Sequence, residues 1–167
     1  MTQNKLTRSI SIEAWCQLAR EGAAPSVTIL LEGSSMQPLI RRDQDPVTIV
    51  PLRRSPKIGD VVLFTTGDDR FVVHRIWKMK PGQVRTFGDN CWYPDPWIPD
   101  TCVLGQAICY SRNGRKIRLD TPAARNWGRF WMALHPMRRC YKKLRSLAGC
   151  RYRKIMPRRP AGGGENG

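Results

Sequence analysis

The feature that most constrains this chain is a series of short β-branched runs, divided by turn residues, from residue 27 to residue 120. The runs are VTILLEG, PVTIVPL, DVVLFT, FVVHRIW, QVRTFGD, CVLGQAICYS and RKIRLD. The breaks between them carry turn residues, and Asn113 with Gly114 is a typical signal for a tight hairpin. The pattern predicts a mainly β domain with an antiparallel core, either barrel-like or a folded sheet.

Helical periodicity flanks the β region on both sides. Residues 11–21 place apolar side chains at helical spacing, which predicts a short N-terminal helix. Residues 126–148 return to this period on either side of Pro136, which predicts two short amphipathic helices. We therefore expect four parts: a lead-in with its helix (1–26), the β domain (27–120), a basic amphipathic helical tail (121–155) and a disordered end (156–167).

The positive charge is concentrated towards the C-terminus. Residues 112–167 carry 16 basic and 2 acidic side chains, whereas residues 1–111 carry 13 and 11. A segment of this kind is attracted to polyanions, which include nucleic acid and the headgroups of an anionic membrane. Charge alone does not choose between these partners.

The sequence gives no sign of a metal site, a cofactor site or a membrane span. The six cysteines form no CxxC pair and have no histidine at zinc-ligand spacing, so we expect structural thiols and no metal or cofactor. The first residues lack the pattern of a signal peptide, and no stretch of about 18 apolar residues occurs. We expect a cytoplasmic or peripherally membrane-associated protein.

Two residues are suited to nucleophilic catalysis. Ser35 lies in GSSMQP directly after the predicted strand VTILLE, so it stands on the turn that leaves a rigid element. A serine needs a base to remove its proton, and the chain has two histidines. His74 lies in the predicted strand FVVHRI, where a neighbouring strand could bring it to Ser35. His135 fits a helix end, where it would cap or pack.

Four sequence boxes occur in a characteristic order: GSSMQP, IGDVVLF, FVVHRI and TFGDN, followed by VLGQA. In order and approximate spacing they resemble the signal peptidase I and LexA-like serine peptidases over about residues 30–110. The resemblance implies the folded antiparallel β-sheet of that group and the activity of a serine endopeptidase without a cofactor. The box VVHRI resembles the corresponding box of the branch whose members use histidine, and not lysine, as their base.

The resemblance assigns roles residue by residue. Ser35 matches the nucleophile, His74 the general base, and Asp95 the acid that orients the histidine. Other residues of the GSSMQP and TFGDN boxes match positions that support the catalytic domain. These supporting residues are Gly33, Met36, Pro38, Gly88, Asp89 and Asn90.

Two details of this assignment stay open. The sequence CWYPDPWIPD departs from the branch motif, so Asp89 and Asp100 compete with Asp95 for the orienting role, which requires only a carboxylate that fixes the imidazole tautomer. The backbone N–H of Ser35 is expected to stabilise the oxyanion. A second donor is unassigned, because Gly33 stands where bacterial signal peptidases place a hydroxyl.

The basic tail offers a means of reaching a membrane. Its aromatic side chains lie on one side of a predicted helix and its basic residues mostly elsewhere, which is typical of a helix in a membrane interface. An equally favoured alternative is that the aromatic side chains pack on the β core, and nucleic acid is the least favoured partner. The predicted contacts with an anionic membrane are Trp127, Trp131, Arg138, Arg139, Lys142 and Lys143.

These observations predict a serine endopeptidase that removes a leader or signal-type segment from a precursor peptide or protein through a Ser–His dyad. The resemblance implies a substrate bound as an extended strand, with small residues before the cut. The alternative is a regulatory module that holds a peptide without cutting it or cleaves itself, with its tail on membrane or nucleic acid. Only 26 residues precede the first predicted strand, too few for a helix-turn-helix domain, so we do not expect a repressor.

Overall fold

The computed structural model describes residues 12–21, 23–66 and 70–137. Within these ranges eight strands form one antiparallel sheet, accompanied by short helices, so the prediction of a mainly β chain is confirmed. In chain order the elements are α1 (Ile12–Arg20), β1 (Val27–Ile29), β2 (Val47–Pro51), β3 (Val61–Thr65), β4 (Phe71–Lys80), β5 (Gln83–Phe87), β6 (Trp97–Pro99), the 3-10 helix η1 (Asp100–Cys102), β7 (Val103–Arg112), β8 (Arg115–Arg118) and α2 (Pro122–Ala133).

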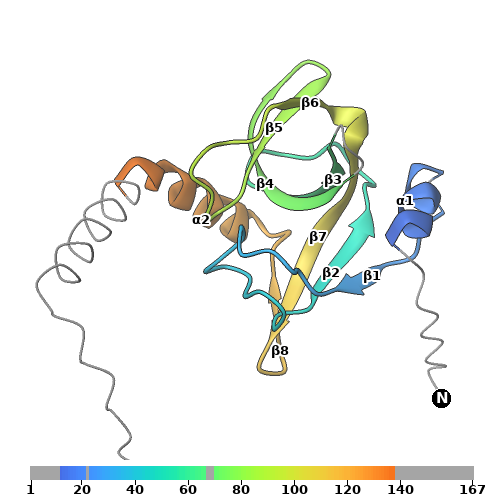
Figure 1. The fold of residues 1–167 in the computed structure, drawn as a ribbon, viewed down its shortest axis with the longest axis horizontal. Coiled ribbons are helices and arrows are strands. Elements are labelled where there is room, and N and C mark those ends of the chain that lie inside the picture. The colour runs from blue at the N-terminus through green and yellow to red at the C-terminus, as the bar shows by residue number, and fades with distance from the viewer. Residues whose placement is uncertain (1–11, 22, 67–69, 138–167) are drawn as a thin grey trace, which may run out of the picture. The chain divides into compact units, whose positions relative to one another are not determined.

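The strands follow the order β1-β2-β7-β3-β4-β5-β6, and β8 pairs with β7 through a hairpin at Asn113 and Gly114. Both turn residues have positive φ, as the predicted tight hairpin requires. Register shifts interrupt three of the ladders, including the pairing of β4 with β5 between Ile76 and Lys78. Irregularities of this kind bend strands. In Figure 1 the strands β3 to β6 curl round at one end of the sheet, while β7 runs on to β2 and β8.

Strand β3 lies at the centre of the apolar core. All five of its residues are buried. Val61 and Leu63 belong to one cluster of buried side chains, and Val62 and Phe64 belong to another. Because successive side chains of a strand point to opposite faces, a strand buried on both faces has a continuous apolar sequence. This explains why DVVLFT shows no polar alternation.

Helix α1 covers one face of the sheet through Trp15. This side chain is fully buried, and its indole N–H donates to the carbonyl oxygen of Pro25 at 2.6 Å. The ring lies against Gly105 of β7, where an added Cβ would stand 2.8 Å from the ring. A glycine on β7 therefore makes room for the helix that the sequence predicted.

Helix α2 begins four residues before the predicted start at residue 126. Thr121 caps it, because its hydroxyl accepts a hydrogen bond from the N–H of Ala124 at 3.1 Å, and Pro122 occupies the first turn. Gly128 packs so closely on the guanidinium of Arg75 that a Cβ would overlap it. Among the described residues, helix α2 up to Met132 belongs to one compact unit with the sheet.

Part of the predicted tail lies outside the described residues. This applies to the end at 156–167, to most of the second predicted helix and to four predicted membrane contacts, Arg138, Arg139, Lys142 and Lys143. In the ranges that the structure describes, no helix combines the length and apolar character needed to cross a membrane.

Candidate active site

His74 lies on β4 and is held by Asp95. Its Nδ1 atom is 2.7 Å from Oδ2 of Asp95, and the residue is only 6% exposed. On the neighbouring strand its ladder partner is Val62 of β3. The opposite ring nitrogen, Nε2, lies beside Gly88 in the turn that follows β5. The imidazole therefore presents one nitrogen to a carboxylate and the other to this turn.

Hydrogen bonds with residues of β5 hold Asp95 in position. Its backbone N–H donates to the carbonyl oxygen of Thr86 at 3.0 Å, and the hydroxyl of Thr86 donates to Oδ2 at 2.6 Å. Nε of Arg85 donates to the carbonyl oxygen of Asp95 at 2.8 Å. Two consecutive residues of a strand thus hold both the backbone and the carboxylate of a loop residue, which is the kind of support that keeps a functional side chain oriented.

The turn after β5 connects His74 with the loop that carries Ser35. The backbone N–H of Asn90 donates to the carbonyl oxygen of Ser35 at 2.7 Å, and its side-chain amide donates to that of Ser34 at 3.2 Å. A Cβ on Gly88 would lie 2.8 Å from Nε2 of His74 and 2.9 Å from the carbonyl oxygen of Ser35. Glycine at this position lets the loop approach the imidazole. The turn after β5 therefore connects the loop of Ser35 with His74, whereas the sequence had suggested that a neighbouring strand would do so.

The surroundings of His74 raise the pKa of its imidazole from 6.5 to about 9. Burial favours the neutral form and is the largest single influence. It is outweighed by hydrogen bonds, first with Asp95 and then with Cys91, together with the charges of these groups. A base with this pKa carries its proton at neutral pH and becomes able to accept one as the pH rises.

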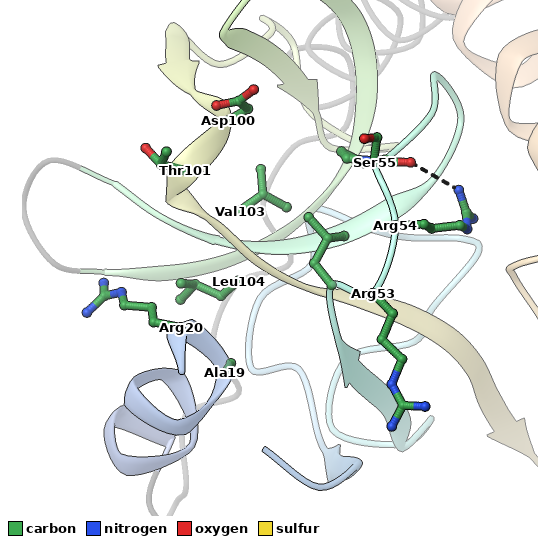
Figure 2. A pocket seen from close by; sticks show the side chains of 11 residues that line it. Ala19, Arg20, Arg53, Arg54, Ser55, Asp100, Thr101, Val103 and Leu104 are labelled. Atoms are coloured by element: carbon green, nitrogen blue, oxygen red, sulfur yellow. Dashed lines mark hydrogen bonds between the residues drawn. The ribbon is translucent and has the colours of Figure 1, made fainter. Parts of the chain in front are cut away.

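The two aspartates that competed with Asp95 lie elsewhere. Asp89 is buried and accepts two hydrogen bonds from the guanidinium of Arg75, at 3.0 and 2.9 Å. Asp100 begins η1 and lines a separate groove of about 570 Å³ with three arginine residues (Figure 2). Of the three candidates, Asp95 is the one in contact with His74.

A groove of about 690 Å³ opens beside Ser35. Its walls are residues 29–33 on one side and residues 70–73 on the other, with Ile12 and Glu13 of α1 also in the lining. Strand β1 is at the edge of the sheet, and β5 pairs with β4 only from residue 75 onward. Among the described strands, residues 71–73 therefore have a ladder partner on the β3 side alone.

The other residues of GSSMQP have structural surroundings. Met36 is 1% exposed and belongs to the apolar core. The carbonyl oxygen of Pro38 accepts a hydrogen bond from Arg112 at 3.4 Å. A Cβ on Gly33 would lie 4.0 Å from Oγ of Ser35, so a side chain there would contact the hydroxyl of Ser35.

The two tryptophans predicted as membrane contacts differ in exposure. Trp127 is 57% exposed, and its ring lies 5.8 Å from that of Phe130, which is also exposed. Trp131 is half-buried, and both tryptophans line the same small cavity. The buried face of α2 is formed by Gly128 and Met132. The two tryptophans, one helical turn apart, therefore share one side of α2, and their contact with a membrane stays a prediction.

Sequence reasoning missed two residues of this site, Cys91 and Thr86. The cysteines were all expected to be structural thiols, yet Cys91 directly follows the TFGDN box and is a hydrogen-bond partner of His74. Its position after GDN was the signal that could have separated it from the other five. Thr86 carried no comparable signal, because its role depends on where the loop after β5 returns.

No protein-family model matches this chain, and no curated protein matches it significantly. Within the part of the chain that the structure describes, no group of three or more His, Cys, Asp or Glu side chains is arranged to hold a metal ion. The residues around His74 themselves therefore have to support any functional proposal.

Proposed function

We propose that this protein is a serine endopeptidase in which Ser35 is the nucleophile, His74 the general base and Asp95 the orienting acid. The supporting observation is the arrangement around the imidazole. Its Nδ1 lies 2.7 Å from the carboxylate of Asp95, while Nε2 lies beside Gly88, against which the backbone of Ser35 also packs. The order of the sequence boxes supports placing the chain, and its curled sheet, with the signal peptidase I and LexA-like group.

The proposed reaction is acyl transfer. The neutral imidazole is the form that reacts, and it becomes populated as the pH rises towards 9. The hydroxyl of Ser35 attacks a peptide carbonyl while Nε2 of His74 takes its proton and then returns it to the leaving amine. In the second half of the reaction His74 takes a proton from water, which attacks the acyl-enzyme, and the proton then returns to the oxygen of Ser35. Asp95 keeps the proton of the imidazole on Nδ1 and stabilises the imidazolium that forms. The backbone N–H of Ser35 is one donor to the oxyanion.

The groove beside Ser35 suits an extended peptide. One wall belongs to the segment that continues from the edge strand β1, and the other contains residues 71–73 of β4. A peptide strand can add main-chain hydrogen bonds to such edges, with alternate side chains entering the apolar lining. We therefore propose a precursor peptide or protein as substrate, cleaved after a leader or signal-type segment.

The test compares new protein N-termini in the native host when it expresses the wild type, Ser35→Ala or His74→Gln. Ser34→Ala and His135→Gln are matched controls, because they change the adjacent serine and the other histidine. We expect cleavage to fall by about 10³-fold or more in both active-site variants and to persist in both controls.

Cleavages that are identical in all five strains would overturn the peptidase. They would favour the alternative in which the groove holds a peptide without cutting it. A loss that occurs with Ser34→Ala as strongly as with Ser35→Ala would contradict the choice of nucleophile.

A further inference from the structure

The turn from Gly88 to Cys91 places a thiol at the imidazole of His74. The N–H of Cys91 donates to the carbonyl oxygen of Gly88 at 2.9 Å, which closes the turn. A Cβ on Gly88 would stand 2.6 Å from Sγ of Cys91 and 2.8 Å from Nε2 of His74. The sulfur and the ring nitrogen therefore lie over the same glycine, and the two side chains are hydrogen-bond partners.

This thiol belongs to a cluster with its own chemistry. The imidazole that contacts Cys91 is bound on its far side by Asp95 at 2.7 Å, so thiol, imidazole and carboxylate follow one another. An imidazolium held in this way stabilises a thiolate beside it, and the thiolate is the reactive form of cysteine. Cys91 is half-buried, so that small reagents can reach it, and it forms no disulfide.

We propose that Cys91 is an oxidation-sensitive modification site that controls access to His74. The imidazolium of His74 stabilises the thiolate of Cys91, and the thiolate sulfur attacks a hydroperoxide. An S–O bond forms and the O–O bond breaks. The departing oxygen takes up the proton of the imidazolium and leaves as water or an alcohol, so that cysteine is oxidised to a sulfenic acid and the peroxide is reduced. The modified side chain occupies the space in front of Nε2, so the imidazole no longer serves Ser35.

The first step stands on the cluster alone, whereas the control of Ser35 rests on the proposed peptidase function. The reactivity of Cys91 can be measured without any substrate. Cys102 and Cys109 are also half-buried thiols, so they serve as internal standards in the same molecule. The full-length protein is treated at pH 7 with limiting iodoacetamide, and mass spectrometry of its peptides gives the alkylation rate at each cysteine.

We expect Cys91 to be alkylated at least about tenfold faster than Cys102 and Cys109. His74→Gln should remove this excess and leave the two standards within about twofold of their wild-type rates. Asp95→Asn should reduce the excess several-fold. Equal rates at the three cysteines of the wild type would overturn the proposal, as would an excess that persists in His74→Gln. Faster alkylation of buried Cys16 in His74→Gln would reveal unfolding of that variant. The alkylation rates of Asp95→Asn would then test the proposal in its place.

The second step is tested with hydrogen peroxide as oxidant, dimedone to trap the sulfenic acid and a fluorophosphonate probe to label Ser35. Peroxide should introduce dimedone at Cys91 and reduce labelling of Ser35 at least about tenfold. In Cys91→Ala, peroxide should leave labelling at the untreated level of that variant. Labelling that survives oxidation of Cys91 would overturn the control of Ser35. No labelling in the untreated wild type would count against the peptidase, while the alkylation ratio would still decide the reactivity of Cys91.

Discussion

His74 and Arg75 are neighbours on β4, and each is paired with an aspartate from the segment that follows β5. Arg75 forms a bidentate pair with Asp89 and a further hydrogen bond to the carbonyl oxygen of Gly59 at 2.8 Å, and both charged residues are almost fully buried. His74 meets Asp95, whose side chain is 25% exposed, and its other nitrogen faces a turn beside the groove of Ser35.

The difference separates a structural ion pair from one that can exchange protons. A guanidinium keeps its charge at all ordinary pH values and matches a carboxylate with two parallel hydrogen bonds, so such a pair fixes geometry. An imidazole changes charge near neutral pH, and its partner determines at what pH it does so. Because adjacent residues of a strand point to opposite faces, one strand can carry both kinds of pair without contact between them.

The largest effect is expected from breaking the structural pair with Asp89→Asn. It would leave the buried guanidinium of Arg75 without its counter-charge, which typically costs 3–5 kcal/mol, so we expect a loss of about that size in the free energy of unfolding. Urea denaturation measures it. Asp43→Asn is the control, because this exposed aspartate pairs with Arg42 at the surface and should cost less than about 1 kcal/mol. Similar costs for both variants would contradict the structural role of Asp89.

The titrating pair predicts a stability that depends on pH. The pKa of His74 is about 9 in the folded protein and 6.5 as its ordinary value, so the proton is bound more tightly in the folded state. Its contribution is complete below pH 6.5 and disappears as the pH rises through 9, a change of about 3 kcal/mol. Urea denaturation between pH 6 and pH 9.5 should show this change as the difference between wild type and His74→Gln. A constant difference across this range would refute the raised pKa.

The sequence predicted the strands and named candidate site residues, but it did not predict the contacts between those residues. Strand positions follow from local runs and turn residues, and the box order selected Ser35, His74 and Asp95. The contact of Asp95 with His74 depends on hydrogen bonds to Arg85 and Thr86, which form only when the loop after β5 folds back. Likewise, nothing local distinguishes Gly128 on α2 as the residue that packs on Arg75.

The smallest predicted effect resolves how much each neighbour contributes to the pKa of His74. Asp95 raises it more than Cys91 does, so Asp95→Asn should lower the imidazole pKa by at least about one unit and Cys91→Ala by less. NMR titration of the ring signals from pH 5 to pH 10 measures both, with His135 as a reference in the same spectra. A larger shift from Cys91→Ala than from Asp95→Asn would mean that the thiol, and not the carboxylate, is the main partner of the imidazolium. The imidazole would then act on Cys91 in preference to Ser35. In the comparison with Arg75 and Asp89, Cys91 would replace Asp95 as the main partner of His74.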